Sequence, residues 1–137
     1  MNFIKYLFRT LFVLYIFLLF FFSFYSFKST PVDLSKYILG IRADRIAHFV
    51  MFFPFPFSAW FAFGGQIKKI TSKFAYSALF ITGIVVASFT EALQAIIPGR
   101  DSDWLDLVAN YSSILMGTLL VILVDKYAKN VWISRLQ

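Results

Sequence analysis

Residues 91–110 read EALQAIIPGRDSDWLDLVAN, and this stretch holds most of the polar chemistry of the chain. Four of the seven acidic residues lie in it, together with one arginine, Arg100. Two apolar runs long enough to cross a lipid bilayer, 74–97 and 104–124, overlap its two ends. Charged side chains this close to lipid are costly and usually functional. We therefore expect the polar residues of the stretch to belong to one site.

The composition of the chain is that of an integral membrane protein. Its 137 residues are 60% hydrophobic and 15% charged, whereas soluble domains are roughly 45–50% apolar and about 25% charged. The absence of cysteine excludes disulfides and cysteine-ligated metal or redox centres. The net charge of +6 is explained by basic residues retained on the cytoplasmic side of a membrane, so it does not indicate a nucleic-acid partner.

The apolar runs predict one all-α domain over residues 1–137. It is an antiparallel bundle of four transmembrane helices, at about 4–27, 46–63, 74–97 and 104–124, because a bilayer core of about 30 Å needs about 20 apolar residues as a helix. The first run is too long for a signal peptide, and its end, FFSFYSFKST, is a poor cleavage site. We therefore interpret it as a retained first helix.

The connector at residues 28–42 is open to two interpretations. The sequence Thr30-Pro31-Val32-Asp33 is typical of a helix start, with a hydroxyl cap, a proline at the first position and an acid at the third. A short interfacial helix that stops at Gly40 would follow. A plain loop fits the residues equally well.

The second apolar run contains two prolines, Pro54 and Pro56. Each removes a backbone hydrogen bond and bends a helix, so we predict a kink there. The kink either opens a pocket near Asp44 and His48 or serves only packing.

The distribution of charge predicts the orientation in the membrane. With four spans, the N-terminus, the basic connector at 66–73 and the C-terminal tail share one side. They carry eight of the thirteen basic residues but only one acidic residue, Asp125. Because basic residues mark the cytoplasmic side, we expect a multi-pass protein with both termini in the cytoplasm. The polar residues around 91–110 then lie at the outer face.

Helical spacing predicts that polar residues of three helices converge at this face. Asp44 and His48 are four residues apart, which places them on one side of a helix. Glu91 and Gln94 are three apart and share a side in the same way. The fourth helix contributes a stripe at intervals of three and four residues. The predicted ligand-binding set is Asp44, Arg45, His48, Glu91, Gln94, Arg100, Asp103, Asp106 and Asn110.

These residues also have purely structural interpretations. Asp103 and Asp106 could be the N-cap and an early acid of the fourth helix. Asn110 could join two helices by a hydrogen bond, and Arg100 could pair with acids of its own loop. A lone histidine is more often structural than a ligand, but His48 shares its membrane face with a cluster of carboxylates.

The order DRIAHFVMFF, then EALQAIIPGRDSDWLDLVAN, then Gly117 resembles the VanZ-like family of small bacterial membrane proteins. That family's pattern has an acidic-basic pair followed by histidine, then Glu-x-x-Gln, an arginine, two spaced aspartates and an asparagine. The resemblance covers about residues 42–124. Arg45 stands where the family more usually has lysine, and Ser113 where it often has glycine. The positions that match are Asp44, His48, Glu91, Gln94, Arg100, Asp103, Asp106, Asn110 and Gly117.

The resemblance implies a location in the bacterial cytoplasmic membrane and a link to resistance against the glycopeptide antibiotic teicoplanin. It implies no defined biochemical activity. It also supports the predicted site, since that site contains most of the matching positions.

Three functions fit this site, and the sequence leaves them open. The first is binding of a cell-envelope amphiphile, a lipid or a cell-wall precursor. Its phosphate or carboxylate would pair with Arg45 and Arg100, and its hydroxyls or amines with the acids. Another is a structural role, in which the polar residues clamp the outer end of the bundle. A proton-coupled transporter is a further alternative, but the basic inner face offers no matching polar path.

The remaining function is that of an enzyme, a membrane-embedded hydrolase or transferase that acts on a lipid-linked substrate. His48 would act as general base, oriented by Glu91 or Asp103. Alternatively, His48, Glu91 and Asp103 would hold a divalent metal ion. The sequence itself requires no cofactor and makes no prediction of the oligomeric state.

Overall fold

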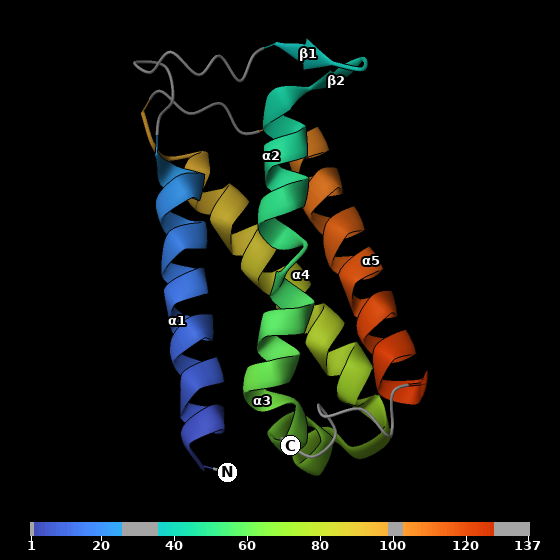
Figure 1. Cartoon of the computed structure of the whole chain (residues 1–137). Helices are drawn as coiled ribbons and strands as arrows, with labels where there is room; N and C mark the ends of the chain where they lie inside the picture. The colour runs from blue at the N-terminus through green and yellow to red at the C-terminus, as the bar shows by residue number, and fades with distance from the viewer. Residues whose placement is uncertain (1, 26–35, 99–102, 128–137) are drawn as a thin grey trace.

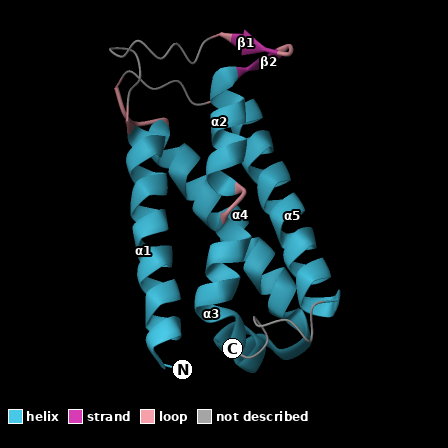
Figure 2. Cartoon of the chain, viewed as in Figure 1, coloured by secondary structure: helices cyan, strands magenta, loops and turns pink. Residues whose placement is uncertain are grey.

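The computed structural model of the chain describes residues 2–25, 36–98 and 103–127. The order of elements is α1 (Asn2–Phe24), β1 (Tyr37–Ile38), β2 (Ile41–Arg42), α2 (Ala43–Phe52), α3 (Phe55–Thr71), the 3₁₀ turn η2 (Ser72–Phe74), α4 (Ala75–Gln94) and α5 (Trp104–Tyr127). Apart from one short hairpin, the described elements are helical (Figure 2). The all-α class predicted from the apolar runs is confirmed.

The helices form an antiparallel bundle. α1 and α4 run toward the end of the bundle where the β1–β2 hairpin lies, and α2, α3 and α5 run away from it (Figure 1). We call this end the hairpin end, and the end where α3 turns into α4 the η2 end. α5 packs against α2, α3 and α4, while α1 packs mainly against α3. The predicted bounds 4–27, 74–97 and 104–124 agree with α1, α4 and α5 to within three residues.

Three stretches of the described chain are long and apolar enough to cross a membrane: Phe3–Phe24, Ala43–Gln94 and Trp104–Tyr127. The middle stretch has 52 residues and contains α2, α3 and α4. Large apolar side chains point outward along the helices, such as Phe17 on α1 and Val85 on α4, which are 65% and 60% exposed. An exposed apolar surface of this extent needs lipid around it, so the chain is a membrane protein.

The kink predicted in the second apolar run is a complete break between two helices. α2 ends at Phe52 and α3 begins at Phe55, because neither Pro54 nor Pro56 has an N–H group to donate. The helix predicted at 46–63 with a kink at its prolines is therefore two helices, α2 and α3, that meet at those prolines.

The predicted end of that helix is wrong. α3 continues through Gly64 and Gly65 to Thr71, so residues 66–71, predicted as a connector, are helical. A glycine costs a helix about 1 kcal/mol relative to alanine, and the buried position of Gly64 allows packing to offset that cost. α3 stops only at Ser72, whose φ of 50° lies in the left-handed region.

Contacts from two neighbouring helices fill the break between α2 and α3. The hydroxyl of Tyr15 on α1 donates to the carbonyl oxygen of Met51 at 2.6 Å, which satisfies a backbone group near the break. On α5, a Cβ added at Gly117 would lie 2.9 Å from the carbonyl oxygen of Phe53 and 3.0 Å from Cγ of Pro56. The glycine thus lets α5 approach the break closely, and this favours the interpretation that the break serves packing.

The start of the proposed interfacial helix, at residues 30–35, lies outside the described residues. The described part of this connector is a hairpin in place of a helix, with Tyr37 paired to Arg42 and Ile38 to Ile41. Leu39 and Gly40 form its turn with φ of 52° and 79°, the left-handed values that a tight two-residue hairpin turn requires. Gly40 is therefore a turn residue and not a helix stop.

The buried apolar core has two parts, one on each side of the break. Toward the hairpin end, Leu19 and Phe52 pack with Ala87 and Ile114. Toward the η2 end, a second cluster is built around Phe55, Ala59, Trp60, Ala75, Leu79 and Val121. α2 thus belongs to the first cluster, and α3 belongs to the second.

Candidate functional site

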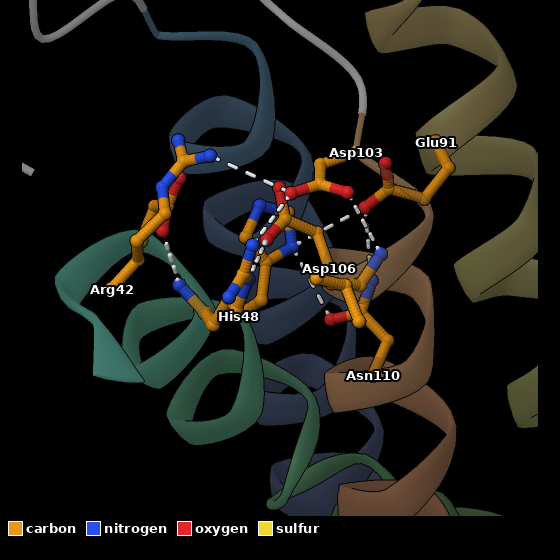
Figure 3. A network of polar contacts seen from close by, with 9 residues as sticks. Arg42, His48, Glu91, Asp103, Asp106 and Asn110 are labelled. Carbon is orange, nitrogen blue, oxygen red and sulfur yellow. Dashed lines mark hydrogen bonds and ion pairs between the residues drawn. The ribbon is translucent and has the colours of Figure 1, made fainter. Parts of the chain in front are cut away.

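The described members of the predicted site come from three helices that meet at the hairpin end (Figure 3). α2 carries three of them, α4 carries Glu91 and Gln94, and α5 carries Asp106 and Asn110, with Asp103 directly before its first residue. Arg100 lies outside the described residues. We describe the site as an inner triad and an outer charged layer, since the two differ in burial and in partners.

The inner triad consists of His48, Glu91 and Asn110, which are 5%, 8% and 0% exposed. Nδ1 of His48 lies 3.2 Å from Oδ1 of Asn110 and 3.4 Å from Oε1 of Glu91. The Asn110 amide donates to that same Glu91 oxygen at 3.1 Å. Because both neighbours of Nδ1 are accepting oxygens, this nitrogen carries the proton. The triad therefore joins α2, α4 and α5 by hydrogen bonds in the bundle interior.

The outer layer contains Arg42, Asp44, Arg45 and Asp103. Arg42 pairs with Asp44 at 2.5 Å and with Asp103 at 3.5 Å. Arg45 donates to Oδ2 of Asp103 at 2.8 Å. These ion pairs tie the start of α2 to the residue that precedes α5, and they are part exposed, with side-chain exposures between 16% and 32%.

Asp103 has two roles in this layer. Its Oδ1 accepts the backbone N–H of Leu105 at 3.0 Å, which makes it a cap of α5. The hydrogen bond from Arg45, and after it the Leu105 N–H, holds the pKa of Asp103 below its ordinary value of 3.8. Asp103 therefore caps α5 and also pairs with the arginines at the start of α2.

Asp106 lies between the two layers and is 3% exposed. Its nearest cationic atom is Nε of Arg45, 3.9 Å from Oδ1, which is too long for a hydrogen bond. Both of these atoms are buried. Within the described part of the chain, Oδ1 of Asp106 accepts no hydrogen bond and Nε of Arg45 donates none. A buried carboxylate oxygen normally has a donor, so this pair of atoms is the place where the network is incomplete.

The structure places Gln94 apart from the other members of the set. Its amide nitrogen donates to the backbone oxygen of Ser23 at 2.8 Å, so it ties α4 to the end of α1. Three residues of helix leave Gln94 rotated by about 60° from Glu91, and here that rotation turns it from the α5 side to the α1 side. In this structure Gln94 makes a helix–helix contact on the α1 side, and its membership of the binding site stays a prediction.

Sequence reasoning missed one charged member of the site, Arg42. In the sequence it belongs to a connector, although it lies two residues from Asp44 and bonds it directly. The signal was present in the short spacing of the charges in the sequence RADR, which begins at Arg42.

Sequence reasoning also missed an apolar groove next to the network. The groove lies between α2 and α5, has a volume of about 460 Å³ and includes Arg45 in its lining. The rest of its lining is mainly apolar, with Ile46, Phe49, Leu105, Val108, Ala109 and Ser112. In the sequence these residues look like any lipid-facing residues, so no pattern marks them.

The three candidate catalytic or metal-binding residues do not meet. His48 and Glu91 are neighbours, whereas Asp103 is paired with the two arginines. Within the described ranges, no group of three His, Asp or Glu side chains is arranged to hold a metal ion. The arrangement is suited to holding a polar group by hydrogen bonds and ion pairs, beside an apolar groove.

Comparison with known proteins gives a family for the chain. No curated protein and no solved structure matched it. A family model described as VanZ/LLP1 matches residues 12–125, which include every described residue of the site. The resemblance drawn from the order of motifs is thereby confirmed, and the chain belongs to the VanZ-like family.

Proposed function

We propose that the protein binds a cell-envelope amphiphile at the hairpin end. Its headgroup would lie at Arg45 and Asp106, and an acyl chain would lie in the groove between α2 and α5. The observation that carries the proposal is the position of Arg45, which belongs to the charged network and also lines the apolar groove. A ligand that contacts Arg45 from the groove side needs a polar end and an apolar end, as an amphiphile has.

The network favours a headgroup with a hydrogen-bond donor beside an anionic group. Among the described residues, the network contains four carboxyl groups and two arginines, so acidic side chains outnumber basic ones. The buried oxygen of Asp106 needs a donor, which an amine or a hydroxyl supplies. Nε of Arg45 donates and suits a phosphate or carboxylate oxygen. Phospholipids with a free amine and precursors of the cell wall combine these groups.

The proposal includes four membrane crossings in a single domain over 1–137. α2 and α3 have 10 and 17 residues, which at about 1.5 Å per residue gives roughly 40 Å. This exceeds the bilayer core of about 30 Å, so the two together make one crossing. The charge distribution supports cytoplasmic termini, which puts the hairpin end at the outer face of the bacterial cytoplasmic membrane. The family resemblance supports a role in the envelope and in teicoplanin resistance.

The test is photo-crosslinking in phosphatidylcholine nanodiscs. The probe is phosphatidylethanolamine with a diazirine in one acyl chain, and the same probe with a choline headgroup is the comparison. We expect the ethanolamine probe to label peptides of α2 and α5 that line the groove more strongly, because choline has no N–H to donate. Equal labelling by both probes, spread over all outward faces, would overturn the proposal.

Two tryptophan variants make the test specific. Ser112 is exposed and lines the groove, so Ser112→Trp fills it. Ser77 is an equally exposed serine on α4, away from the groove, so Ser77→Trp is the control. Filling the groove should lower labelling about tenfold, which corresponds to a loss of about 1.4 kcal/mol of binding free energy. Labelling should be kept in the control.

A second candidate function is hydrolysis or group transfer on a lipid-linked substrate. The contact that favours it is the one between His48 and Glu91, since a carboxylate at Nδ1 orients an imidazole that acts as a general base. Purified protein incubated with envelope lipid extract should then release a headgroup product, detected by mass spectrometry. Release should be lost in His48→Ala and kept in Gln94→Met. No release by the wild-type protein would exclude this function.

A further inference from the structure

A second pocket lies at the η2 end, far from the site described above. It is enclosed by the first turns of α1 and the second half of α3, two segments that lie side by side in Figure 1. Its volume is about 210 Å³. Three basic residues line it, Lys5, Arg9 and Lys69, and no acidic residue does. We call it the basic pocket.

The pocket exists because α3 carries two glycines where α1 passes it. Gly64 and Gly65 both line the pocket, and neither has a side chain to fill it. Arg9 reaches over this gap and is fixed there. Its Nε donates a long hydrogen bond to the carbonyl oxygen of Ala62 at 3.5 Å, and its guanidinium lies 5.6 Å from the centre of the Phe63 ring. The guanidinium thus lies at the pocket, and the described part of the chain places no carboxylate on its outer nitrogens.

Within the described residues, basic side chains outnumber acidic ones at the η2 end. Asp125 is the acidic residue of the η2 end, and its carboxylate is already engaged by Lys68 at 2.9 Å and by the hydroxyl of Tyr76 at 2.5 Å. In the described part of the chain, Arg9 and Lys69 have no carboxylate partner. A concave site with two such cations attracts an anion.

We propose that the basic pocket binds the phosphate of an anionic lipid in the leaflet at the η2 end. Arg9 lies seven residues into α1, about 10 Å along the helix, which suits the boundary between headgroups and acyl chains. Phe61 and Phe63 also line the pocket, so they offer an apolar surface next to the bound phosphate. Basic pockets between membrane helices recognise anionic headgroups in this way, and arginine binds phosphate through a planar pair of donors.

This site is independent of the one at the hairpin end. It uses other residues, lies at the other end of the bundle, and prefers a net negative headgroup. The proposal depends only on the chain being in a membrane.

The test measures lipid retained by the purified full-length protein by native mass spectrometry. The protein is exchanged into mixed micelles that contain equal amounts of phosphatidylglycerol and phosphatidylcholine. We expect the wild-type protein to retain phosphatidylglycerol selectively. Arg9→Gln and Lys69→Gln should each reduce that selectivity about tenfold, because each removes one charge-assisted contact. Arg9→Lys, which keeps the charge, should restore part of it.

Lys126→Gln is the matched control, because Lys126 is an exposed lysine at the same end that does not line the pocket. It removes one positive charge and should leave the selectivity unchanged. If Lys126→Gln lowers the selectivity as much as Lys69→Gln does, the effect is general charge attraction and the proposed pocket is overturned. Equal retention of the two lipids by the wild-type protein overturns it as well.

Free phosphate is separated from lipid by a second measurement. Inorganic phosphate is added to the protein in phosphatidylcholine nanodiscs, and thermal unfolding is followed. A lipid site predicts little stabilisation by phosphate alone and a clear rise in Tm when phosphatidylglycerol replaces part of the phosphatidylcholine. The same rise with phosphate alone would assign the pocket to the free ion and contradict the lipid proposal.

Discussion

The amide of Asn110 on α5 donates to the carboxylate of Glu91 on α4 at 3.1 Å, in the interior of the bundle. The amide oxygen of the same asparagine lies 3.2 Å from Nδ1 of His48 on α2. One side chain thus satisfies an acceptor on one helix and a donor on another. The removal of Asn110 would therefore disturb both partners at once.

We expect Asn110→Ala to lower the free energy of unfolding by about 1–3 kcal/mol, because it leaves buried polar groups without a partner. The measurement is reversible unfolding in mixed detergent and denaturant. Ser112→Ala, an exposed position on the same helix, is the control and should be neutral. An Asn110→Ala protein as stable as the wild type would show that the triad contributes nothing to the fold.

Asp103 allows its capping role to be separated from its ion pair. In Asp103→Asn the cap of α5 is retained, since asparagine caps as well as aspartate, and the pairing with Arg45 is lost. The folded protein holds the pKa of Asp103 below 3.8. The stability that pairing provides is therefore present above 3.8 and is lost as the pH falls through the lowered folded pKa.

The expected result is a wild-type protein that is more stable than Asp103→Asn at pH 7 but approaches it on acidification below pH 3.8. Asp103→Ala should be the least stable of the three at neutral pH, because it loses the cap as well. Thermal unfolding followed from pH 7 downward checks this order. A constant difference between the wild type and Asp103→Asn over the whole pH range would contradict it.

Tyr15→Phe should weaken the packing of the break between α2 and α3. The variant removes the hydroxyl that donates to Met51 at 2.6 Å, and a hydrogen bond of this kind contributes about 0.5–1.5 kcal/mol. Tyr6→Phe, an exposed tyrosine of the same helix, is the matched control for the unfolding measurement. Equal stability of the two variants would mean that the break does not need this donor.

Gln94→Met distinguishes a structural residue from a binding residue. The variant loses the hydrogen bond to Ser23 and should lower stability by about 1 kcal/mol. Because Gln94 lies on the α1 side, crosslinking of the ethanolamine probe to the groove should remain at the wild-type level. Reduced crosslinking in a folded Gln94→Met protein would return this residue to the binding site.

The sequence predicts the parts of the fold that hydrophobicity alone determines. α4 and α5 follow from apolar runs bounded by Pro98-Gly99 and by Asp103, and the meeting of His48 with Glu91 follows from helical spacing at one membrane face. The extension of α3 through Gly64 could not be predicted, because the packing that tolerates this glycine comes from other helices.

The sequence also could not predict which neighbour each polar side chain of the site contacts. Whether Gln94 turns toward α5 or toward α1 depends on the rotation of α4 in the bundle, which no local pattern determines. The groove beside Arg45 is lined by side chains of both α2 and α5. The direction of Gln94 and the shape of the groove depend on how several helices pack, so the sequence of one helix does not reveal them.

The proline break separates α2 from α3, and each of these two helices packs into its own apolar cluster. The backbone hydrogen-bond ladder is interrupted between them at the prolines, so α2 and α3 can adjust their positions separately. Evolution can then retune each end of the molecule by itself, and a double variant that combines Arg45→Gln with Arg9→Gln should combine their separate effects without interference.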